Sequence, residues 1–506
     1  MTPEGLPGKP VSPWLDRAGE SRPPLHRKTR CDVLVAGGGI AGVSTALALT
    51  VRGLKVILLE ARTVASGVTG NSSGKLSALQ GTAYSRIRHA AGSEAAARYA
   101  DLNLAGIAQI ESLAEAHGIS CEFLNRPAVT YATTDDGRHE LEQEFDAARD
   151  AGLSLDLGSD SDLPFPVTGA LTMTGQAQVD PVAWARGIAG VIVEHGGEVF
   201  EGTRVTGVDQ GSPCSVTTDT GAEILADRIV IATHNPILDR GLFFARMDSQ
   251  RSYAVAGKVT GSMPEGMYLS ADEPLRSIRP MTSGEAPPGT LLVSGEGHGV
   301  GTGDPTARYR TMGRFLQDTF GVSEITHRWC AHDEMSPDRL PFVGPILPRN
   351  DRIMVTTGYS KWGLAASVGA ASLLADRLAG IERPALETFA PSRARQFRQV
   401  GKLANLGLKT GYHLAGDRIR KRASEKELKP GDGAVVGDGL KQVAVHRDDS
   451  GELHRLSARC THLGCIVAWN GADQTWDCPC HGSRFDTDGA VIQGPATSPL
   501  PGADKT

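Results

Sequence analysis

The chain has 506 residues, of which 40% are hydrophobic and 22% are charged, and its formal net charge is -6. This composition is typical of a soluble globular protein with room for about three domains. Charges of one sign form no long run, so the sequence gives no reason to expect nucleic acid as a partner.

The apolar run over residues 31–51 is interrupted by four glycines, and its N-terminal flank lacks the basic-then-apolar layout of a signal peptide. We therefore expect a cytoplasmic protein without a membrane span. Half of the eight cysteines are scattered along the chain, whereas the other four fall within residues 460–480 and need a chemical explanation.

The first predicted unit, after an extended arm over residues 1–30, is a dinucleotide-binding turn. Its parts follow in chain order: a buried strand at 33–36, the glycines Gly37, Gly39 and Gly42 of a G-x-G-x-x-G pattern, a helix at 41–52, a strand at 55–59, and Glu60. The glycines let the backbone approach a pyrophosphate, the helix N-terminus supplies N–H donors, and the acid accepts from ribose hydroxyls.

The next stretch, ARTVASGVTGNSSGKLSALQG at residues 61–81, is a loop where a nicotinamide dehydrogenase would continue into a helix. It resembles the flavin-contacting loop of the glycine and D-amino-acid oxidase (DAO) family of FAD-dependent oxidoreductases. Residues 178–209, 226–235 and 357–380 resemble further segments of that family, so the likeness runs from about residue 30 to 385.

This resemblance implies an α/β fold, in which a Rossmann-type FAD-binding domain is combined with a mixed-sheet substrate domain over residues 31–385. FAD-binding parts are expected at 31–85, 175–240 and 335–385, and substrate-side parts at 86–174 and 241–334. Residues 86–118 are expected as one long amphipathic helix.

The residues expected to contact FAD share a place in these matching segments. They are Gly37, Gly39, Ile40, Ala41, Gly42, Glu60, Ala61, Arg62, Gly67, Thr69, Gly70, Asn71, Ser72, Ser73, Lys75, Leu76, Val205, Ala232, Thr233, Gly358, Trp362 and Gly363. Some relatives attach FAD through a cysteine, but the distance from Cys330 to Asp338 differs by one residue from that pattern. The histidine that other relatives use would fall at Asn71, so we expect FAD to bind non-covalently.

The candidate catalytic residues near the flavin are Lys75, Tyr253, His298 and Lys361. Each has a plainer alternative: His298 could be a loop histidine bonded to backbone, and Tyr253 an ordinary sheet aromatic.

A different pattern, Glu324, His327 and His332, has the residue types of an iron site with one carboxylate and two histidines. The segment also matches a flavoprotein strand, and residues five apart in a strand face opposite sides. The structural reading is therefore preferred over iron.

The composition changes after residue 385. Residues 386–430 are polar and basic and are expected as a helical linker, whereas residues 431–506 show short alternating runs typical of a small all-β domain.

Two short motifs, CTHLGC and CPCHGS, place two cysteines and two histidines in two loops of this last domain. The set Cys460, His462, Cys478 and His481 suits a Rieske 2Fe-2S cluster, and zinc is the alternative. Both loops and the trailing Gly494–Ala496 resemble the disulfide-containing Rieske proteins of quinol-oxidising complexes. That resemblance implies a disulfide between Cys465 and Cys480.

High-potential members of that family carry Gly-Ser-x-Tyr after the second histidine, and here the tyrosine is replaced by Phe485. Ser483 keeps one hydroxyl donor to the cluster and Phe485 supplies none. Fewer hydrogen bonds to the sulfurs stabilise the reduced cluster less, so we expect a lower potential.

These observations predict an FAD-dependent oxidoreductase that oxidises a small amine or amino-acid-like substrate and passes electrons through the cluster to an unknown acceptor. Two alternatives stay open: a non-catalytic electron-transfer module, and an oxygen-using oxidase with a structural Rieske domain.

Overall fold

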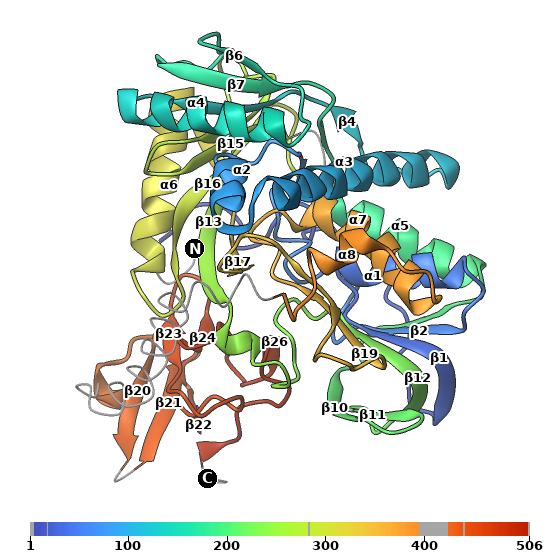
Figure 1. Ribbon diagram of the computed structural model, residues 1–506. Helices are drawn as coiled ribbons and strands as arrows, with labels where there is room; N and C mark the ends of the chain where they lie inside the picture. Colours follow the sequence, from blue (N-terminus) through green and yellow to red (C-terminus); the bar gives the residue numbers. More distant parts are fainter. Residues whose placement is uncertain (1–4, 18, 282–283, 394–423, 439–440, 504–506) are drawn as a thin grey trace.

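The computed structural model describes residues 5–17, 19–281, 284–393, 424–438 and 441–503. Two large sheets with their helices make up most of this part of the chain, and small β-sheets form its C-terminal end (Figure 1). Most of the linker that was expected to be helical, residues 394–423, lies outside the described residues.

The first large sheet is built around parallel strands and has the order β10-β11-β12-β1-β2-β9. β19 pairs with the second half of β12, and β18 pairs with β19. The strands are β1 (Thr29–Ala36), β2 (Val56–Leu59), β9 (Glu198–Phe200), β10 (Val205–Asp209), β11 (Cys214–Thr218), β12 (Glu223–Ile231), β18 (Phe342–Pro345) and β19 (Ile353–Thr357). All four residues of β2 are buried, as expected for a parallel strand covered on both faces.

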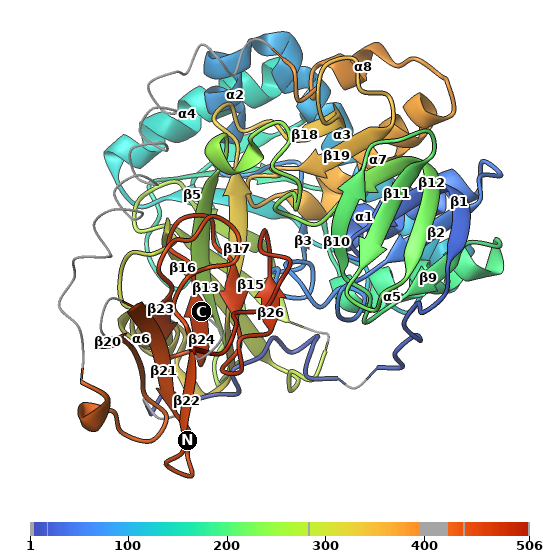
Figure 2. The same ribbon diagram turned by 90° about the horizontal axis from the view of Figure 1, so that it is seen from below.

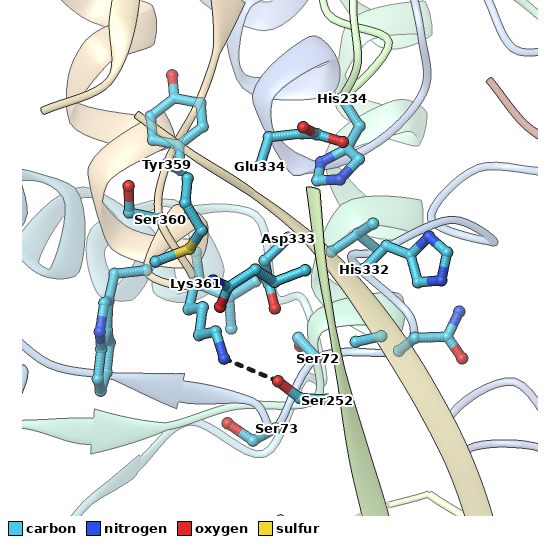
Figure 3. Close-up of a pocket in the computed structure, with 18 of the residues that line it drawn as sticks. Ser72, Ser73, His234, Ser252, His332, Asp333, Glu334, Tyr359, Ser360 and Lys361 are labelled. Atoms are coloured by element: carbon cyan, nitrogen blue, oxygen red, sulfur yellow. Dashed lines mark hydrogen bonds between the residues drawn. The ribbon is translucent and has the colours of Figure 1, made fainter. Parts of the chain in front are cut away.

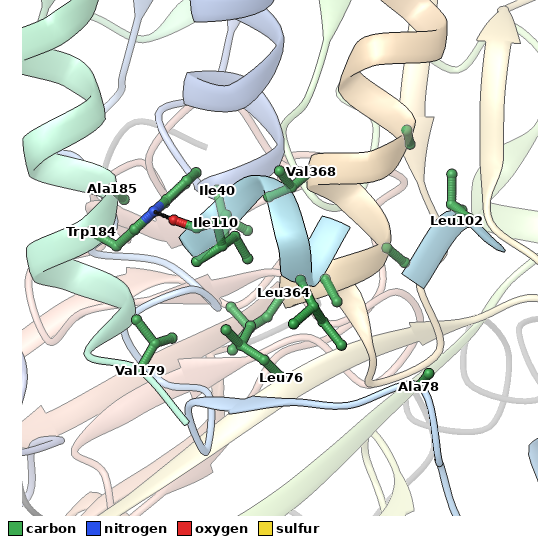
Figure 4. Packing of buried hydrophobic residues seen from close by; sticks show 14 of the residues in the cluster. Ile40, Leu76, Ala78, Leu102, Ile110, Val179, Trp184, Ala185, Leu364 and Val368 are labelled. Carbon is green, nitrogen blue, oxygen red and sulfur yellow. Dashed lines mark hydrogen bonds between the residues drawn. The ribbon is translucent and has the colours of Figure 1, made fainter. Parts of the chain in front are cut away.

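Helices cover one face of this sheet and form the largest core of the protein (Figures 1 and 4). They are α1 (Ile40–Thr50), α5 (Pro181–Glu194), α7 (Gly363–Leu378) and the short α8 (Pro384–Glu387). Trp184 of α5 is 1% exposed and its indole Nε1 donates to the carbonyl oxygen of Ile110 at 3.2 Å. This bond satisfies the one polar atom of a large buried ring.

The expected single helix over residues 86–118 is wrong, because the chain forms two helices there, α2 (Ala83–Ala91) and α3 (Ser93–Ala116). Gly92 separates them with a φ of 92°, a conformation that favours glycine and breaks the helix. α3 then crosses α7 closely: a Cβ on Gly106 would lie 1.9 Å from the carbonyl oxygen of Ala365. This crossing fixes the N-terminus of α7 at the cavity described below.

The second large sheet has the order β17-β13-β16-β15-β14-β5-β7-β6. Its strands are β5 (Ala128–Ala132), β6 (Asp156–Gly158), β7 (Gly169–Met173), β13 (Asp248–Val259), β14 (Met267–Ser270), β15 (Arg276–Met281), β16 (Thr290–Gly299) and β17 (Val322–Met335). Helices α4 (Asp135–Asp150) and α6 (Pro305–Phe320) lie on it, and β3 (Lys75–Leu76), β4 (Leu124–Asn125) and β8 (Ala177–Gln178) form a small separate sheet.

The C-terminal part lies beside β13 and β17 (Figures 1 and 2). One of its sheets contains β20 (Gly433–Asp438), β21 (Lys441–Arg447) and β22 (Leu453–Ser457). The other contains β23 (Ala468–Asn470), β24 (Thr475–Asp477), β25 (Arg484–Phe485) and β26 (Val491–Gln493). Trp476 and Phe485 are fully buried in its core.

The short 3-10 helices are η1 (Phe243–Ala245) and η3 (Glu425–Glu427). Within the described ranges, no helix has the length and apolar character needed to cross a bilayer.

Candidate functional site

A cavity of about 1140 Å³ is lined by residues of both large sheets. Its walls include parts of residues 10–15, 36–41, 59–83, 203–205, 232–237, 250–254, 269–277, 330–335 and 356–364, together with Arg484 and residues 492–494. Polar side chains from several of these segments converge inside it (Figure 3).

The glycine-rich turn forms one end of the cavity. Gly37 has a φ of 109°, and a Cβ on Gly42 would lie 1.8 Å from the carbonyl oxygen of Gly37, so only glycine lets α1 begin so close to β1. Glu60 follows β2 and accepts from the backbone N–H of Gly38 at 2.6 Å. The helix N-terminus and the carboxylate are the features that bind the pyrophosphate and ribose of a dinucleotide, so this end fits such a cofactor.

The residues expected to contact FAD fall into two groups. All of them line the cavity except Gly42, Gly70, Leu76 and Gly358.

The loop over residues 61–81 is tied to the nucleotide turn, because the Thr69 hydroxyl oxygen accepts from the backbone N–H of Ile40 at 3.0 Å.

Lys75 lies in the cavity wall on β3. Its Nζ donates to the Ser277 hydroxyl at 2.5 Å and to the Tyr268 carbonyl oxygen at 3.2 Å, and it lies 5.8 Å from the centre of the Trp362 ring. Burial, aided by the nearby charge of Arg279, lowers the pKa of Lys75 to about 7. This amine can therefore gain or lose a proton near neutral pH.

Lys361 reaches the cavity from a turn with unusual backbone conformation. Gly358, Ser360 and Lys361 have φ angles of 73°, 50° and 78°, and two of these residues are not glycine. The Lys361 ammonium donates to the Ser252 hydroxyl at 2.8 Å (Figure 3). Its charge also opposes the rise that burial causes in the pKa of Asp333, whose carboxyl group lines the same wall. Non-glycine residues in this conformation often occur at functional sites.

Glu334 is a buried carboxyl group on the cavity wall, and it has no ion pair with any residue that the structure describes. It accepts from the Ser249 hydroxyl at 2.8 Å and from the Asn235 amide at 3.2 Å. Burial raises the pKa of Glu334 to about 8, and the nearby acids Asp333 and Asp248 add to that rise. The cavity wall thus holds a protonated carboxyl group at neutral pH.

Of the other two catalytic candidates, Tyr253 lines the cavity and His298 does not. Tyr253 is fully buried, and its ring packs edge-on against Tyr309. His298 lies outside the lining, stacks on Tyr253 with ring centres 5.6 Å apart, and contacts the Tyr253 hydroxyl through Nε2 at 3.0 Å. Lys75, Tyr253 and Lys361 are therefore the catalytic candidates that line the cavity.

Sequence reasoning missed Ser252, His234, Asp333 and Glu334 as cavity residues. The two acids directly follow His332, which we weighed only as an iron ligand. Their place near the end of a strand that leads back to the flavin segment was the available signal.

The N-terminal arm was expected only as an extended segment, but Pro10, Val11 and Leu15 line the cavity. Trp14 is 1% exposed and packs against Trp329 with ring centres 5.9 Å apart. The Ser12 hydroxyl donates to the carbonyl oxygen of Gly70 at 2.5 Å, so the arm is fastened to the loop over residues 61–81.

The four expected cluster ligands come together at one edge of the C-terminal part. Cys460 and Cys478 are buried, and a hydrogen bond from the Cys478 thiol lowers the pKa of Cys460 to about 7. The rings of His462 and His481 lie with centres 5.1 Å apart. Both ring nitrogens of His481 are buried and have no hydrogen-bond partner among the described residues. Paired thiols and an unsatisfied imidazole fit a site that holds metal.

Ser483 supplies the hydroxyl that was expected near the cluster. It is fully buried and forms a hydrogen bond with Cys460 that helps to lower the pKa of that thiol. Phe485 lies in the core of the domain and offers no donor.

A disulfide joins Cys465 to Cys480 and links the two ligand loops. The sulfur of Cys478 lies within 4.8 Å of the sulfurs of Cys465 and Cys480. In the described part of the chain, this is the one group of three side chains close enough to share a metal ion. Two of these three sulfurs are bonded to each other, so the three cannot act together as metal ligands.

The iron pattern is not assembled. Glu324 is exposed, the His327 ring contacts Asp16 at 3.3 Å, and His332 Nε2 accepts from Arg251 at 2.8 Å.

Cys330 is not a suitable attachment point for a cofactor. Its thiol lies 3.1 Å from an oxygen of Asp473, and burial raises the pKa of the thiol to about 12. A thiol that stays protonated is a poor nucleophile.

Comparison with known families finds two matches. Residues 32–377 match the family described as FAD dependent oxidoreductase (DAO), and residues 420–503 match the Rieske [2Fe-2S] domain.

One similar relative matches nearly the whole chain. It is YhfW of Bacillus subtilis (strain 168), a protein assigned by name to the Rieske 2Fe-2S iron-sulfur proteins, which is 35% identical over 484 residues. That match covers 95% of this chain and 94% of the relative. The C-terminal part alone is 43% identical over 86 residues to the cytochrome b6-f complex iron-sulfur subunit 2 from the cyanelle of Cyanophora paradoxa, covering 16% of this chain and 35% of that protein.

Solved structures show the fold of the larger part. Glycine oxidase from Geobacillus kaustophilus superposes with a TM-score of 0.60 at 20% identity, covering 72% of this chain and 99% of that enzyme. L-proline dehydrogenase from P. horikoshii superposes with a TM-score of 0.59 at 17% identity, covering 74% of this chain and 99% of that enzyme.

Proposed function

The chain belongs to the DAO family of FAD-dependent oxidoreductases and carries a C-terminal Rieske domain, and we propose that it oxidises a small amine or amino-acid-like substrate and passes the electrons through the cluster to an acceptor. Its cofactors are FAD and a [2Fe-2S] cluster. The structural neighbours named above act on glycine and on L-proline, which supports a substrate of this class.

One observation carries the proposed path of the electrons. Arg484 and residues 492–494 belong to the Rieske domain, yet they line the same cavity as the glycine-rich turn and the loop over residues 61–81. A flavin in this cavity would have the Rieske domain as part of its wall.

The residues that would hold FAD come from four parts of the chain. The turn around Gly39 and the N-terminus of α1 would take the pyrophosphate, and Glu60 would take a ribose. The loop over residues 61–81 and the N-terminus of α7 would contact the flavin ring. Because burial keeps the Cys330 thiol protonated, we expect acid to release all of the FAD from the protein.

Bound FAD takes up a hydride and the cluster takes up single electrons, and the protein supplies orientation and proton transfer. Lys75, with a pKa of about 7, can accept a proton from a substrate ammonium near neutral pH. Removing that proton frees the nitrogen lone pair that drives hydride loss from the neighbouring carbon. The Asp333 carboxyl group and the Lys361 amine line the same wall and can orient a polar substrate through hydrogen bonds.

The substrate class is tested by an anaerobic screen of amines and amino acids. A substrate of the proposed class should bleach the flavin absorption in a single turnover. If no amine or amino acid bleaches it, the non-catalytic relay becomes the better explanation.

The electron path is tested by His481→Ala, with His454→Ala as a matched control at a half-exposed histidine outside the ligand set. His481→Ala should abolish the Rieske signal in electron paramagnetic resonance and leave FAD content unchanged. Substrate should still bleach the flavin once, while steady turnover with cytochrome c should collapse. Unchanged turnover, together with fast reaction of the reduced flavin with oxygen, would favour an oxidase with a structural cluster.

A further inference from the structure

The Rieske domain inserts a loop into the substrate-side domain. Ala472, between β23 and β24, is 1% exposed and belongs to the same hydrophobic cluster as Tyr253, Tyr309 and Cys330. The Arg328 guanidinium donates to the Ala472 carbonyl oxygen at 3.5 Å. The two domains therefore share a core at this contact and do not meet only through polar surface groups.

Asp473, the next residue, accepts hydrogen bonds from both domains. From the substrate side, the Tyr309 hydroxyl lies 2.9 Å from one oxygen and the Cys330 thiol lies 3.1 Å from the other. From its own domain, Arg484 donates at 3.2 Å and Asn470 at 2.9 Å.

Asp477, the last residue of β24, also accepts hydrogen bonds from both domains. Arg251 of β13 donates to it at 2.5 Å in an ion pair whose side chains are only 6% and 11% exposed. Its other partners are Arg484 at 3.1 Å, Asn470 at 2.9 Å and Thr475 at 2.9 Å. Arg251 is itself held by a bond from its Nε to His332.

These contacts orient the cluster-binding loops toward the flavin cavity. A Cβ on Gly482 would lie 3.3 Å from Nδ1 of His332, a residue of the cavity lining. The Asn235 amide lies 3.4 Å from the carbonyl oxygen of His481. The Phe244 ring packs edge-on against both cluster imidazoles, with ring centres 5.2 Å from His481 and 5.7 Å from His462.

We propose that the Rieske domain is held in one fixed position on the flavoprotein, and that Arg251, Asp473 and Asp477 are the positioning residues. The buried Asp477 and the partly buried Asp473 each accept hydrogen bonds from both domains, and they keep all of these bonds in one relative orientation of the domains. The network therefore fixes the register of the interface. His332 and Asn235 then bridge the cavity lining and the loop that carries His481. No domain movement is needed between reduction of the flavin and reduction of the cluster.

The inference deepens the proposed function and rests on it, since a fixed position matters for catalysis only if electrons pass between the two cofactors. Bound FAD would supply two electrons and the cluster would accept one at a time, so a one-electron acceptor would have to reoxidise the cluster between the two transfers.

The test compares Asp477→Asn and Arg251→Gln with the wild-type protein, using Asp488→Asn, a 77% exposed carboxylate of the same domain, as the matched control. The first readout is hydrogen–deuterium exchange of peptides covering residues 327–335 and 470–484. Both interface variants should exchange about tenfold faster or more there, which corresponds to about 1.4 kcal/mol in the opening equilibrium. Asp488→Asn should exchange as the wild type does.

The second readout is cluster reduction after anaerobic photoreduction of FAD with a deazaflavin. In the wild type its rate should be independent of viscosity set with glycerol, and in both interface variants it should be slower and should fall as viscosity rises. The Rieske signal in electron paramagnetic resonance verifies that the cluster is intact. Arg251 lies outside the Rieske domain, so Arg251→Gln still tests the interface if Asp477→Asn prevents that domain from folding.

Wild-type exchange in both interface variants, or a wild-type reduction rate that falls in proportion to viscosity, would overturn the fixed position. If the cluster is not reduced at all in the wild type, the proposed function fails. The exchange measurement still decides in that case whether these residues hold the domain.

Discussion

The cavity wall and the domain interface each bury a carboxyl group, and they set its charge in opposite ways. Glu334 accepts from a hydroxyl and an amide and lies near two acids, and burial raises its pKa to about 8. Burial also acts to raise the pKa of Asp477, but the charges of Arg251 and Arg484 outweigh it and hold that pKa well below its usual value. Neighbouring charges, more than depth, therefore decide whether a buried acid is ionised.

This difference matches what the two regions do in our proposal. A carboxyl group that keeps its proton suits a cavity in which protons and hydrides move. A carboxylate that is permanently charged and fully hydrogen-bonded suits a contact whose task is to hold two domains in register.

Among the variants proposed here, Arg251→Met should reduce stability the most, because it removes the cation and leaves Asp477 buried. We expect the Rieske domain to lose about 3–5 kcal/mol of stability, because an uncompensated buried charge costs that much. Denaturant unfolding followed by the visible absorption of the cluster measures it. The double variant R251M/D477L, which removes both charges, should recover most of the loss; no recovery would mean that the ion pair is not the cause.

Glu334→Gln tests the other carboxyl group. In the wild type the folded state keeps the Glu334 proton between pH 4.5 and about 8 while the unfolded state does not, so stability falls as pH rises through that window. Glutamine has no such dependence. Even if the pKa of Glu334 rises by only half of this difference, Glu334→Gln should be more stable than the wild type by about 2 kcal/mol above pH 8. The measurement is the free energy of unfolding as a function of pH. Parallel profiles for the two proteins would contradict a raised pKa.

Lys75→Met tests a buried cation of the cavity, for which the sign is reversed. Because the pKa of Lys75 is lowered from 10.5 to about 7, the unfolded state binds more protons between these values and wild-type stability rises with pH. The methionine variant should be more stable by about 1 kcal/mol below pH 7, with the gap closing at higher pH. The effect is smaller than for Glu334, because two hydrogen bonds and the Trp362 ring partly compensate the lysine.

Glu223→Gln should change the stability of the protein the least. Glu223 pairs with Lys28 at 3.0 Å, but their side chains are 43% and 65% exposed. An exposed pair in water contributes less than about 0.5 kcal/mol, and salt should remove even that. A loss approaching that of Arg251→Met would refute the claim that burial and networking distinguish the interface.

Local features of this protein could be read directly from its sequence. The nucleotide turn is a set of neighbours along the chain, because strand, glycines, helix and acid must follow one another to build it. The cluster motifs are similarly local, since each loop carries one cysteine ligand and one histidine ligand at a spacing that lets both reach the same cluster. The fold class and both cofactors follow from these motifs together with the family resemblance.

Other features depend on contacts between distant segments. The sequence offered no sign that Pro10 and Leu15 line the cavity or that Cys330 is bonded to Asp473. Such contacts form only when finished surfaces pack together, and they leave no spacing or periodicity in the chain.

The charge states of the buried acids follow the same division. The sequence alone determines that Glu334 and Asp477 are carboxyl groups, and their residue types give them similar intrinsic acidity. Only the tertiary structure decides that one lies beside hydroxyl and amide groups and the other between two arginines drawn from two domains. The reason is that electrostatic energy depends on distance in space and on the surrounding dielectric, neither of which is encoded by position along the chain.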